Sequence, residues 1–384
     1  MTDDRVMAPD LAETGAADLP PGLPAVAARP APEPGDPSAV RRWFDGLLDE
    51  PIPAADGTLA TARRTADALA RRANADNTRR AYRAGVRAWC SWCARHDLPA
   101  LPAAPADIAA FLSAARYPPP GGKRLAVNTV KLRKAAIRYL HYLARLPSPT
   151  STVDVTATLA GITRDAAQHG DGPRPKLAAR IGIMCEILAA TGDDLRGLRD
   201  RALLLVGFAG AFRRSELARI AIEHIEDTEH GLRITLPVSK GDRAMQGVVV
   251  GIPYGTSERC PVRALRRWQQ AAGIADGPVF RRIWATPRPA RPPPDWTPTL
   301  VVGTQAIDPG TVARIMKARG AAAGFDATVL SGHSLKRGAM NTARDRRVHP
   351  TQLKQLGRHA NYATLGAYLE EGDLFEDNAL NGVL

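Results

Sequence analysis

The sequence predicts a mainly helical protein with one small β-sheet or hairpin, that is, an α+β fold class, and three observations support this prediction. Apolar residues recur at helical spacing over most of the chain from residue 59 onward. Two runs rich in β-branched residues, 232–238 and 248–252, flank a polar turn at 239–242 and predict a hairpin. The length of 384 residues suits two domains, and a Pro-rich stretch begins at residue 147 between the two helical regions.

The charge of the chain is strongly positive and unevenly placed. The whole sequence has 52 Lys and Arg against 39 Asp and Glu, a net charge of +13. Residues 1–60 hold 4 basic and 11 acidic residues, whereas residues 61–146 hold 17 basic and 4 acidic ones. The folded part is therefore the basic part, and a polyanion such as nucleic acid is its expected partner.

Residues 1–58 predict a disordered acidic tail rich in Pro and Ala. Up to residue 37 no helical or strand period is present, so this stretch cannot bury enough apolar surface to offset the entropy of ordering. The only helical pattern in the tail covers residues 38–48.

Residues 59–146 predict a bundle of about four helices, at 59–74, 78–96, 107–115 and 128–145. In the last of these, apolar positions lie on one side and the basic residues Lys131, Lys134 and Arg138 lie on another. Because acidic partners are scarce in the segment, this basic face favours phosphate contact over a merely solvated surface. Residues 147–176 predict a linker.

The four cysteines indicate a reducing compartment, because their spacing is irregular and no apolar signal segment begins the sequence. Cys90 and Cys93, with His96, form half of a zinc pattern, but no second ligand pair follows. We therefore expect core thiols and no metal site. No run of 18 apolar residues is present, so we expect a cytoplasmic protein that does not bind membranes.

Residues 177–384 predict the second domain, which contains several polar motifs. Residues 199–220 predict an apolar helix pair. The first, apolar helix ends near Arg213 and Glu216, which are three residues apart and can pair on one helix face. Lys240 lies in the hairpin turn, and the segments 332–338 and 356–359 precede further helices. Each motif taken alone is also explained by a surface salt bridge, a solvated lysine or a helix start.

Together and in this order, the motifs resemble those of the tyrosine recombinases, the phage-integrase family. The nine residues from His359 to Tyr368 match the last motif of that family. Residues 77–82, which include Arg79 and Arg80, resemble its first helix. The resemblance covers residues 60–384 and implies a SAM-like helical DNA-binding domain, with these two arginines as DNA contacts, followed by a tyrosine-recombinase catalytic domain.

The resemblance implies a site-specific DNA recombinase, or integrase, that cuts duplex DNA through a 3′-phosphotyrosyl intermediate at Tyr368. A phenol with a pKa of about 10 is a poor nucleophile at neutral pH, so it needs cations that favour its phenolate. Arg213 can hold phosphate oxygens with its planar fork, and Glu216 can fix that fork.

The same resemblance assigns the remaining roles of the site. Lys240 protonates the departing 5′ oxygen, while His333 and His359 hydrogen-bond to the phosphate. The resemblance also allows His333 to move the proton of the tyrosine. No ATP, metal or other cofactor is required. The implied partners are a double-stranded DNA recombination site and three further copies of the chain, which form a homotetramer on paired sites. The sequence identifies neither the target site nor accessory proteins, nor does it distinguish integration, resolution and inversion.

One position departs from the family pattern. The family has an arginine three residues after His333, where this chain has Lys336 followed by Arg337. On a helix these two residues lie about 60° and 40° to either side of His333, so the sequence leaves open which one reaches the phosphate. A lysine would supply a point charge in place of a bidentate fork. The loss keeps a second hypothesis open, a recombinase-derived DNA-binding protein without cleavage activity.

The nucleophile also has an alternative. His359 and Tyr368 are half a turn out of phase, so a helix break must lie between them, and Asn361 is a suitable cap for the next helix. Tyr362 is a second, less favoured nucleophile because it lies only three residues from His359. Supercoil relaxation by a monomer, as in type IB topoisomerases, is a third hypothesis, which the compact size and the helical first domain disfavour.

Overall fold

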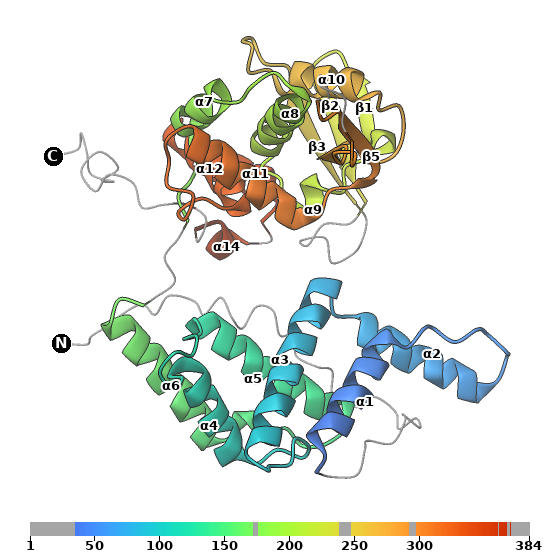
Figure 1. Cartoon of the computed structure of the whole chain (residues 1–384), viewed down its shortest axis with the longest axis vertical. Helices are drawn as coiled ribbons and strands as arrows, with labels where there is room; N and C mark the ends of the chain where they lie inside the picture. The colour runs from blue at the N-terminus through green and yellow to red at the C-terminus, as the bar shows by residue number, and fades with distance from the viewer. Residues whose placement is uncertain are drawn as a thin grey trace. The chain divides into compact units, whose positions relative to one another are not determined.

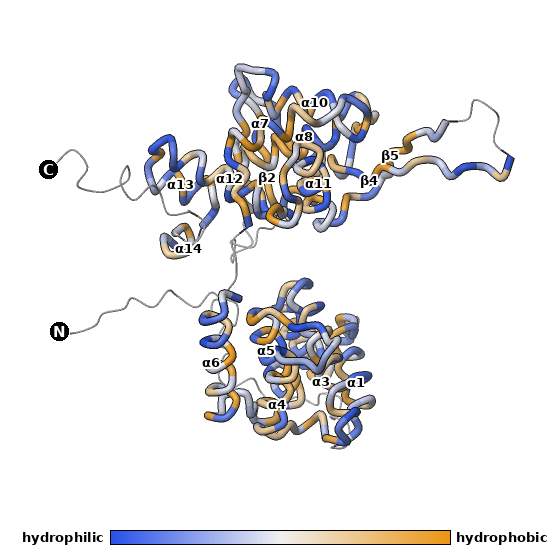
Figure 2. The backbone as a smooth tube through the Cα atoms, turned by 60° about the vertical axis from the view of Figure 1, so that its left-hand side comes forward, coloured by the Kyte–Doolittle hydropathy of each residue, from blue (hydrophilic) through white to orange (hydrophobic). Residues whose placement is uncertain are grey.

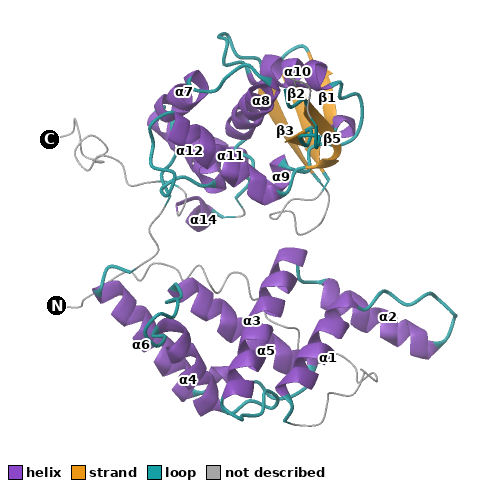
Figure 3. Cartoon of the chain, viewed as in Figure 1, coloured by secondary structure: helices purple, strands orange, loops and turns teal. Residues whose placement is uncertain are grey.

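The computed structural model divides into two compact units, Met1–Arg174 and Pro175–Leu384 (Figure 1). It describes residues 35–171, 176–237, 247–291, 297–359, 361–366 and 369. Helices dominate both units, and the strands form small antiparallel sheets in the second (Figure 3). The predicted α+β fold class is confirmed. Within the described ranges, no helix combines the length and the apolar character needed to cross a membrane.

The first unit is a helical bundle around the buried ring of Trp89. Its helices are α1 (Pro37–Asp49), α2 (Leu59–Arg72), α3 (Asp76–Arg95), α4 (Pro105–Arg116), α5 (Val127–Leu143) and α6 (Val153–Gln168). Helix α3 packs along α5 and α1, and α4 packs along α6. The indole nitrogen of Trp89 donates to the carbonyl of Ala100 at 2.9 Å, which satisfies the polar atom of this buried side chain.

Two of the predicted boundaries of this unit are wrong. Helix α1 lies inside the predicted tail, yet Val40 and Phe44 are fully buried in the core of the bundle. Helix α6 lies inside the predicted linker, yet Val155 and Ile162 are buried in the same core. In both segments the apolar residues recur at helical spacing, and their burial outweighs the Pro-rich composition around them.

The core also contains Cys90 and Cys93, as predicted. Both thiols are buried, and burial raises the pKa of each to about 12, so both stay protonated.

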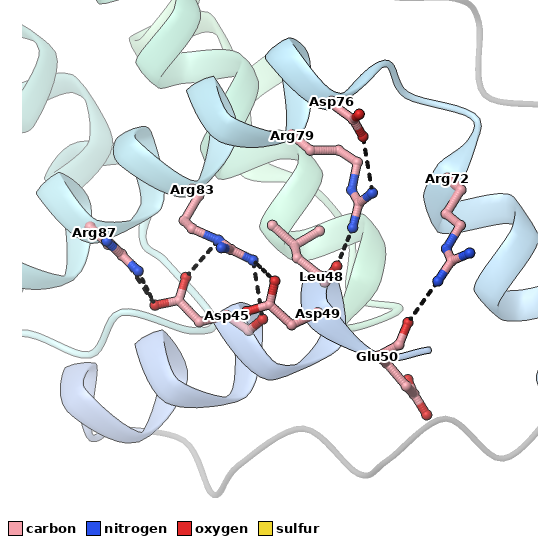
Figure 4. A network of polar contacts seen from close by, with 9 residues as sticks. All are labelled: Asp45, Leu48, Asp49, Glu50, Arg72, Asp76, Arg79, Arg83 and Arg87. Carbon is pink, nitrogen blue, oxygen red and sulfur yellow. Dashed lines mark hydrogen bonds and ion pairs between the residues drawn. The ribbon is translucent and has the colours of Figure 1, made fainter. Parts of the chain in front are cut away.

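A row of arginines on α3 holds α1 in place (Figure 4). Arg83 and Arg87 each lie close to Asp45, with nitrogen–oxygen distances of 3.2 and 3.0 Å. Arg79, one turn earlier, donates to the carbonyl of Leu48 at the end of α1. The spacing of four residues brings all three guanidinium groups to the same face of α3, opposite α1.

Every strand in the part of the chain that the structure describes belongs to the second unit. Its elements are α7 (Ile181–Ala189), α8 (Leu195–Ala209), α9 (Arg214–Leu217), β1 (Ile225–Thr228), β2 (Gly231–Leu236), β3 (Val248–Pro253), α10 (Pro261–Ala272), β4 (Arg281–Ala285), β5 (Leu300–Ala306), α11 (Pro309–Ala322), α12 (Gly332–Asp345), α13 (Pro350–Gly357) and α14 (Tyr362–Gly366). The predicted hairpin is confirmed as β2 and β3, which pair antiparallel from Gly231 opposite Pro253 to Leu236 opposite Val248. The turn between them, with Lys240, lies outside the described residues.

Helix α8 is the centre of the second unit. It packs against α10 on one side and α12 on another, and its residues 202–206 are buried. Figure 2 shows the alternation of hydrophobic and hydrophilic segments along the elements of both units. Because a helix buried on several sides is fixed by its neighbours, the turn that follows α8 has a defined position, and this turn carries the first site residues.

Candidate active site

Arg213 and Glu216 come together at the turn from α8 into α9. Arg213 is the residue before the first turn of α9, and Glu216 lies three residues later. The Glu216 carboxylate accepts from the Arg213 side chain at 2.7 Å and from the Arg213 backbone N–H at 2.9 Å. The predicted pair is therefore confirmed as a contact, and it is buried, since the Glu216 side chain is only 3% exposed.

A second arginine, Arg358, binds the same carboxylate and was not predicted. It follows α13, and its Nη2 lies 2.8 Å from Oε2 of Glu216. The guanidinium group also donates to the carbonyls of Gly210 and Ala211, at 2.8 and 2.7 Å. It stacks over the ring of Phe212, 5.2 Å from the ring centre. The turn after α8 and the turn after α13, which are far apart in the sequence, are thus joined at one buried carboxylate.

The two arginines keep Glu216 ionised. Burial by itself raises the pKa of Glu216, but the charge of Arg358 and the hydrogen bonds from Arg213 outweigh it, and the pKa falls to about 2. The carboxylate is therefore negative at any physiological pH. It is the shared ion-pair partner of two largely buried guanidinium groups.

The structure brings Lys336 into this cluster and directs Arg337 elsewhere. The Lys336 side chain is fully buried, and its Nζ donates to the carbonyl of Gly357 at the end of α13. Burial lowers its pKa to about 6, assisted by the nearby charges of Arg213 and Arg358 and opposed by Glu216. Arg337 instead donates to the carbonyl of Lys176. Helix geometry alone did not show which of the two side chains joins the cluster, and the packing of α12 places Lys336 in it.

The two candidate histidines occupy different environments. His359 follows Arg358 and is 5% exposed. Its burial, together with the charge of Lys336 and then of the two arginines, lowers its pKa to about 4, so the imidazole is neutral at pH 7. His333 is exposed in the first turn of α12, where Ser331 caps the helix by accepting from the His333 backbone N–H at 3.2 Å.

Tyr368, the predicted nucleophile, lies outside the described residues, as Lys240 does. The predicted helix break after His359 is confirmed, because α14 starts anew at Tyr362 and Asn361 caps it by accepting from the backbone of Thr364 at 2.8 Å. The hydroxyl of Tyr362 is 3.2 Å from that of Thr351 on α13, and the Tyr362 side chain is exposed.

The predicted DNA contacts of the first unit divide into two groups. Lys131, Lys134 and Arg138 lie on α5, where the first two are partly exposed and the third is exposed. Arg80 is exposed on α3, whereas Arg79 is directed to the end of α1. Among the residues that the structure describes, no group of three or more His, Cys, Asp or Glu is placed to hold a metal ion.

Known proteins resemble the chain in sequence and in fold, although no protein-family model matches it. An "Integrase/recombinase xerD homolog" from Selenomonas ruminantium is 32% identical over 314 residues, which cover 81% of this chain and 86% of that protein. "Recombinase cre" from Escherichia phage P1 is 24% identical over 219 residues, which cover 56% of this chain and 61% of that protein.

Among solved structures, the XerH site-specific recombinase in a post-cleavage complex with its difH substrate matches with a TM-score of 0.59, at 11% identity, over 92% of this chain and 99% of that one. The Tn1549 transposon integrase bound to circular intermediate DNA matches with a TM-score of 0.51, at 12% identity, over 90% and 99%. The sequence relatives thus define the class as enzymes that cleave and rejoin DNA. The chain belongs to the tyrosine recombinase family, and it is a site-specific recombinase.

Proposed function

We propose that this recombinase cuts and rejoins duplex DNA at a site formed by Tyr368 and the buried cations of the second unit, and that the first unit is its main DNA-binding domain. The observation that carries the proposal is the convergence of Arg213, Lys336 and Arg358 around one carboxylate, Glu216. Two arginines, together with a lysine that a bound anion would protonate, lie around one carboxylate. The cluster is therefore short of negative charge, and a phosphodiester supplies it.

The cluster suits the charge that develops on a phosphate during transfer. Arg213 uses Nη1 for Glu216, which fixes the plane of its fork toward a bound phosphate. Lys336 is the cation that takes the second-arginine role, because Arg337 is directed to a backbone carbonyl outside the cluster. An incoming anion favours the charged form of Lys336, so the lysine gains its proton when the phosphate binds. Preorganised donors of this kind stabilise a transition state without reorganisation.

The reaction balances without a cofactor. The phenolic oxygen of Tyr368 forms a bond to phosphorus, and the bond from phosphorus to the 5′ oxygen breaks. We assign the protonation of that leaving oxygen to Lys240, and the removal of the phenolic proton to His333. His359, a neutral imidazole, hydrogen-bonds to the phosphate. The phosphotyrosyl ester keeps the energy of the broken bond, and attack by a free 5′ hydroxyl reverses the step.

The first unit supplies binding by phosphate contact. We assign this role to Arg80 on α3 and to Lys131, Lys134 and Arg138 on α5. Arg79 is left out because it holds α1. Contacts of this type make affinity fall steeply as salt concentration rises. The proposed assembly is a homotetramer on paired sites in the cytoplasm, and the integration or excision of a mobile element is the proposed task.

A gel assay for a covalent protein–DNA adduct tests this function. Nicked duplexes tiled from the DNA that flanks the gene are incubated with the wild type, with Tyr368→Phe and with Tyr362→Phe as the matched control. We expect a denaturant-resistant band with the wild type and with Tyr362→Phe, and none with Tyr368→Phe. A band that survives Tyr368→Phe contradicts the proposed nucleophile.

The same gel also tests the second hypothesis. Salt-sensitive binding by the wild type without a band on any tile supports a recombinase-derived DNA-binding protein that no longer cleaves. The feature that favours this outcome is the lysine at position 336, whose lowered pKa weakens it as a cation in the absence of DNA.

A further inference from the structure

Two residues with side chains adopt left-handed backbone conformations at the candidate active site. Ala211, in the turn after α8, has φ of +43°, and Arg358, after α13, has φ of +51°. This region is unfavourable for residues other than glycine, and it persists where the surrounding structure fixes it. Each of these two turns carries a site residue, Arg213 in the first and His359 in the second.

The side chain of Arg358 connects the two turns. Its guanidinium group donates hydrogen bonds to the carbonyls of Gly210 and Ala211 and to one carboxylate oxygen of Glu216, all at 2.7–2.8 Å. In return, the backbone carbonyl of Arg358 accepts from Nη2 of Arg213 at 3.5 Å. The unfavourable turn at Ala211 is therefore fixed by the residue that forms the other unfavourable turn.

The geometry of these contacts requires a guanidinium group. Four acceptors lie around one planar fork, the fourth being the carbonyl of Leu356 at 3.2 Å, whereas an ammonium group is a compact point charge on a flexible stem. The face of the fork also lies over the ring of Phe212. The Arg358 side chain is 7% exposed, so water does not replace a lost contact easily.

We infer that Arg358 is a positioning residue for strand cleavage: it joins the turn of Arg213 to the turn of His359 and holds Glu216 so that the Arg213 fork meets the phosphate. The inference rests on the proposed function. Arg358 acts through Glu216 and Arg213 and needs no contact with DNA. Its charge also acts on Lys336 and His359, whose pKa values it helps to lower.

Two substitutions separate the fork from the charge. Arg358→Lys keeps the charge and loses the fork, and Arg358→Met loses both. Arg201→Met is the matched control, because Arg201 also donates to two backbone carbonyls, those of Leu188 and Thr191, but lies outside the site. Single-turnover adduct formation on a nicked duplex is measured across pH for each full-length variant, together with duplex affinity and thermal unfolding.

We expect Arg358→Met to slow adduct formation about 100-fold and Arg358→Lys to slow it about 10-fold, since a misplacement of about 1 Å has effects of this size. Duplex affinity should change less than threefold in both, because the phosphate contacts of the first unit remain. The rate should fall on the alkaline side as Lys336 loses its proton. This fall should move to higher pH in Arg358→Met, because the charge that lowers the pKa of Lys336 is lost, and it should stay in place in Arg358→Lys, which keeps the charge. Arg201→Met should cleave at the wild-type rate with an unchanged pH profile.

Three results overturn the inference. One is a folded Arg358→Met variant that cleaves at the wild-type rate. The second is a loss of rate in Arg358→Lys and Arg358→Met that Arg201→Met reproduces, because the role would then be general stability. The third is an unchanged pH profile in Arg358→Met. A wild type that forms no adduct contradicts the proposed function instead, so the two failures are distinguishable.

Discussion

Each unit of the molecule contains a network of arginines and carboxylates, and the two networks differ in their access to water. In the first unit, Arg83 bridges Asp45 and Asp49, and the side chains are 27%, 20% and 66% exposed (Figure 4). In the second unit, Glu216 lies between Arg213 and Arg358, and the carboxylate is 3% exposed. The residue types and distances are similar, but the surroundings are not.

The difference shows which network can perform chemistry. Water screens the outer pairs between α1 and α3, such as Arg83 with Asp49, so each of these contributes about 0–1 kcal/mol and serves mainly to orient α1. Around Glu216 the same charges lie in a poorly hydrated region, where removing one partner leaves the others uncompensated. A buried cluster with an excess of positive charge is sensitive to any added anion, which is what a phosphate-handling site requires.

Among the substitutions in the two networks, Glu216→Gln should lower the free energy of unfolding the most. The substitution keeps the shape of the side chain and leaves two buried guanidinium groups without their anion, so we expect the free energy of unfolding to fall by about 3 kcal/mol. The measurement is urea unfolding of the full chain. A loss below about 1 kcal/mol would mean that the buried network contributes no more to the free energy of unfolding than the exposed one.

Lys336→Ala should cleave DNA much more slowly than Arg337→Ala. Only Lys336 lies in the cluster, so its loss should slow adduct formation by about 100-fold, as for the loss of one donor to a transition state. Arg337→Ala should remain within about threefold of the wild type, because its guanidinium group contacts a carbonyl outside the cluster. Single-turnover assays on the nicked duplex measure both rates, and the opposite ranking would place Arg337 at the phosphate.

The stability of the DNA-free protein should depend on pH through Lys336. Its pKa is about 6 in the folded chain and near 10.5 when unfolded, so between these values the unfolded state binds a proton that the folded state lacks. Stability should therefore rise with pH above about 6, by up to about 1.4 kcal/mol per pH unit. Urea unfolding of the wild type and of Lys336→Met at pH 6, 7.5 and 9 tests this. An equal pH dependence in the two proteins would exclude Lys336 as its source.

Asp49→Asn should have the smallest effect. Asp49 is mostly exposed and pairs with Arg83 at 2.5 Å, so we expect a change below about 0.5 kcal/mol in the free energy of unfolding and none in cleavage. Urea unfolding and the adduct assay on the same preparation measure both. A change as large as that of Glu216→Gln would remove the distinction between the two networks.

The sequence was sufficient for the parts of the site that depend on local spacing. Arg213 and Glu216, three residues apart, pair as expected, and Asn361 caps the helix that follows the predicted break. A short helix over 38–48 was expected and is present as α1, but composition missed that α1 and α6 belong to the core. A Pro-rich neighbourhood indicates a loop even where apolar residues at helical spacing find a core.

Other parts of the site depend on tertiary structure. The choice between Lys336 and Arg337 is nearly symmetric on a helix wheel and is made by how α12 packs. Arg358 gives no periodic signal, because its role comes from a turn in the left-handed region and from acceptors almost 150 positions earlier in the chain. The sequence offers one signal for Arg358: it is a basic residue immediately before His359, a predicted site residue.

In the proposed reaction, the buried cations of the second unit serve a tyrosine nucleophile at position 368. The most direct test is to digest the DNA of the wild-type adduct with nuclease and to locate the remaining nucleotide on the chain by mass spectrometry. We expect the nucleotide on Tyr368. A nucleotide on Tyr362, or on any other side chain, would contradict it.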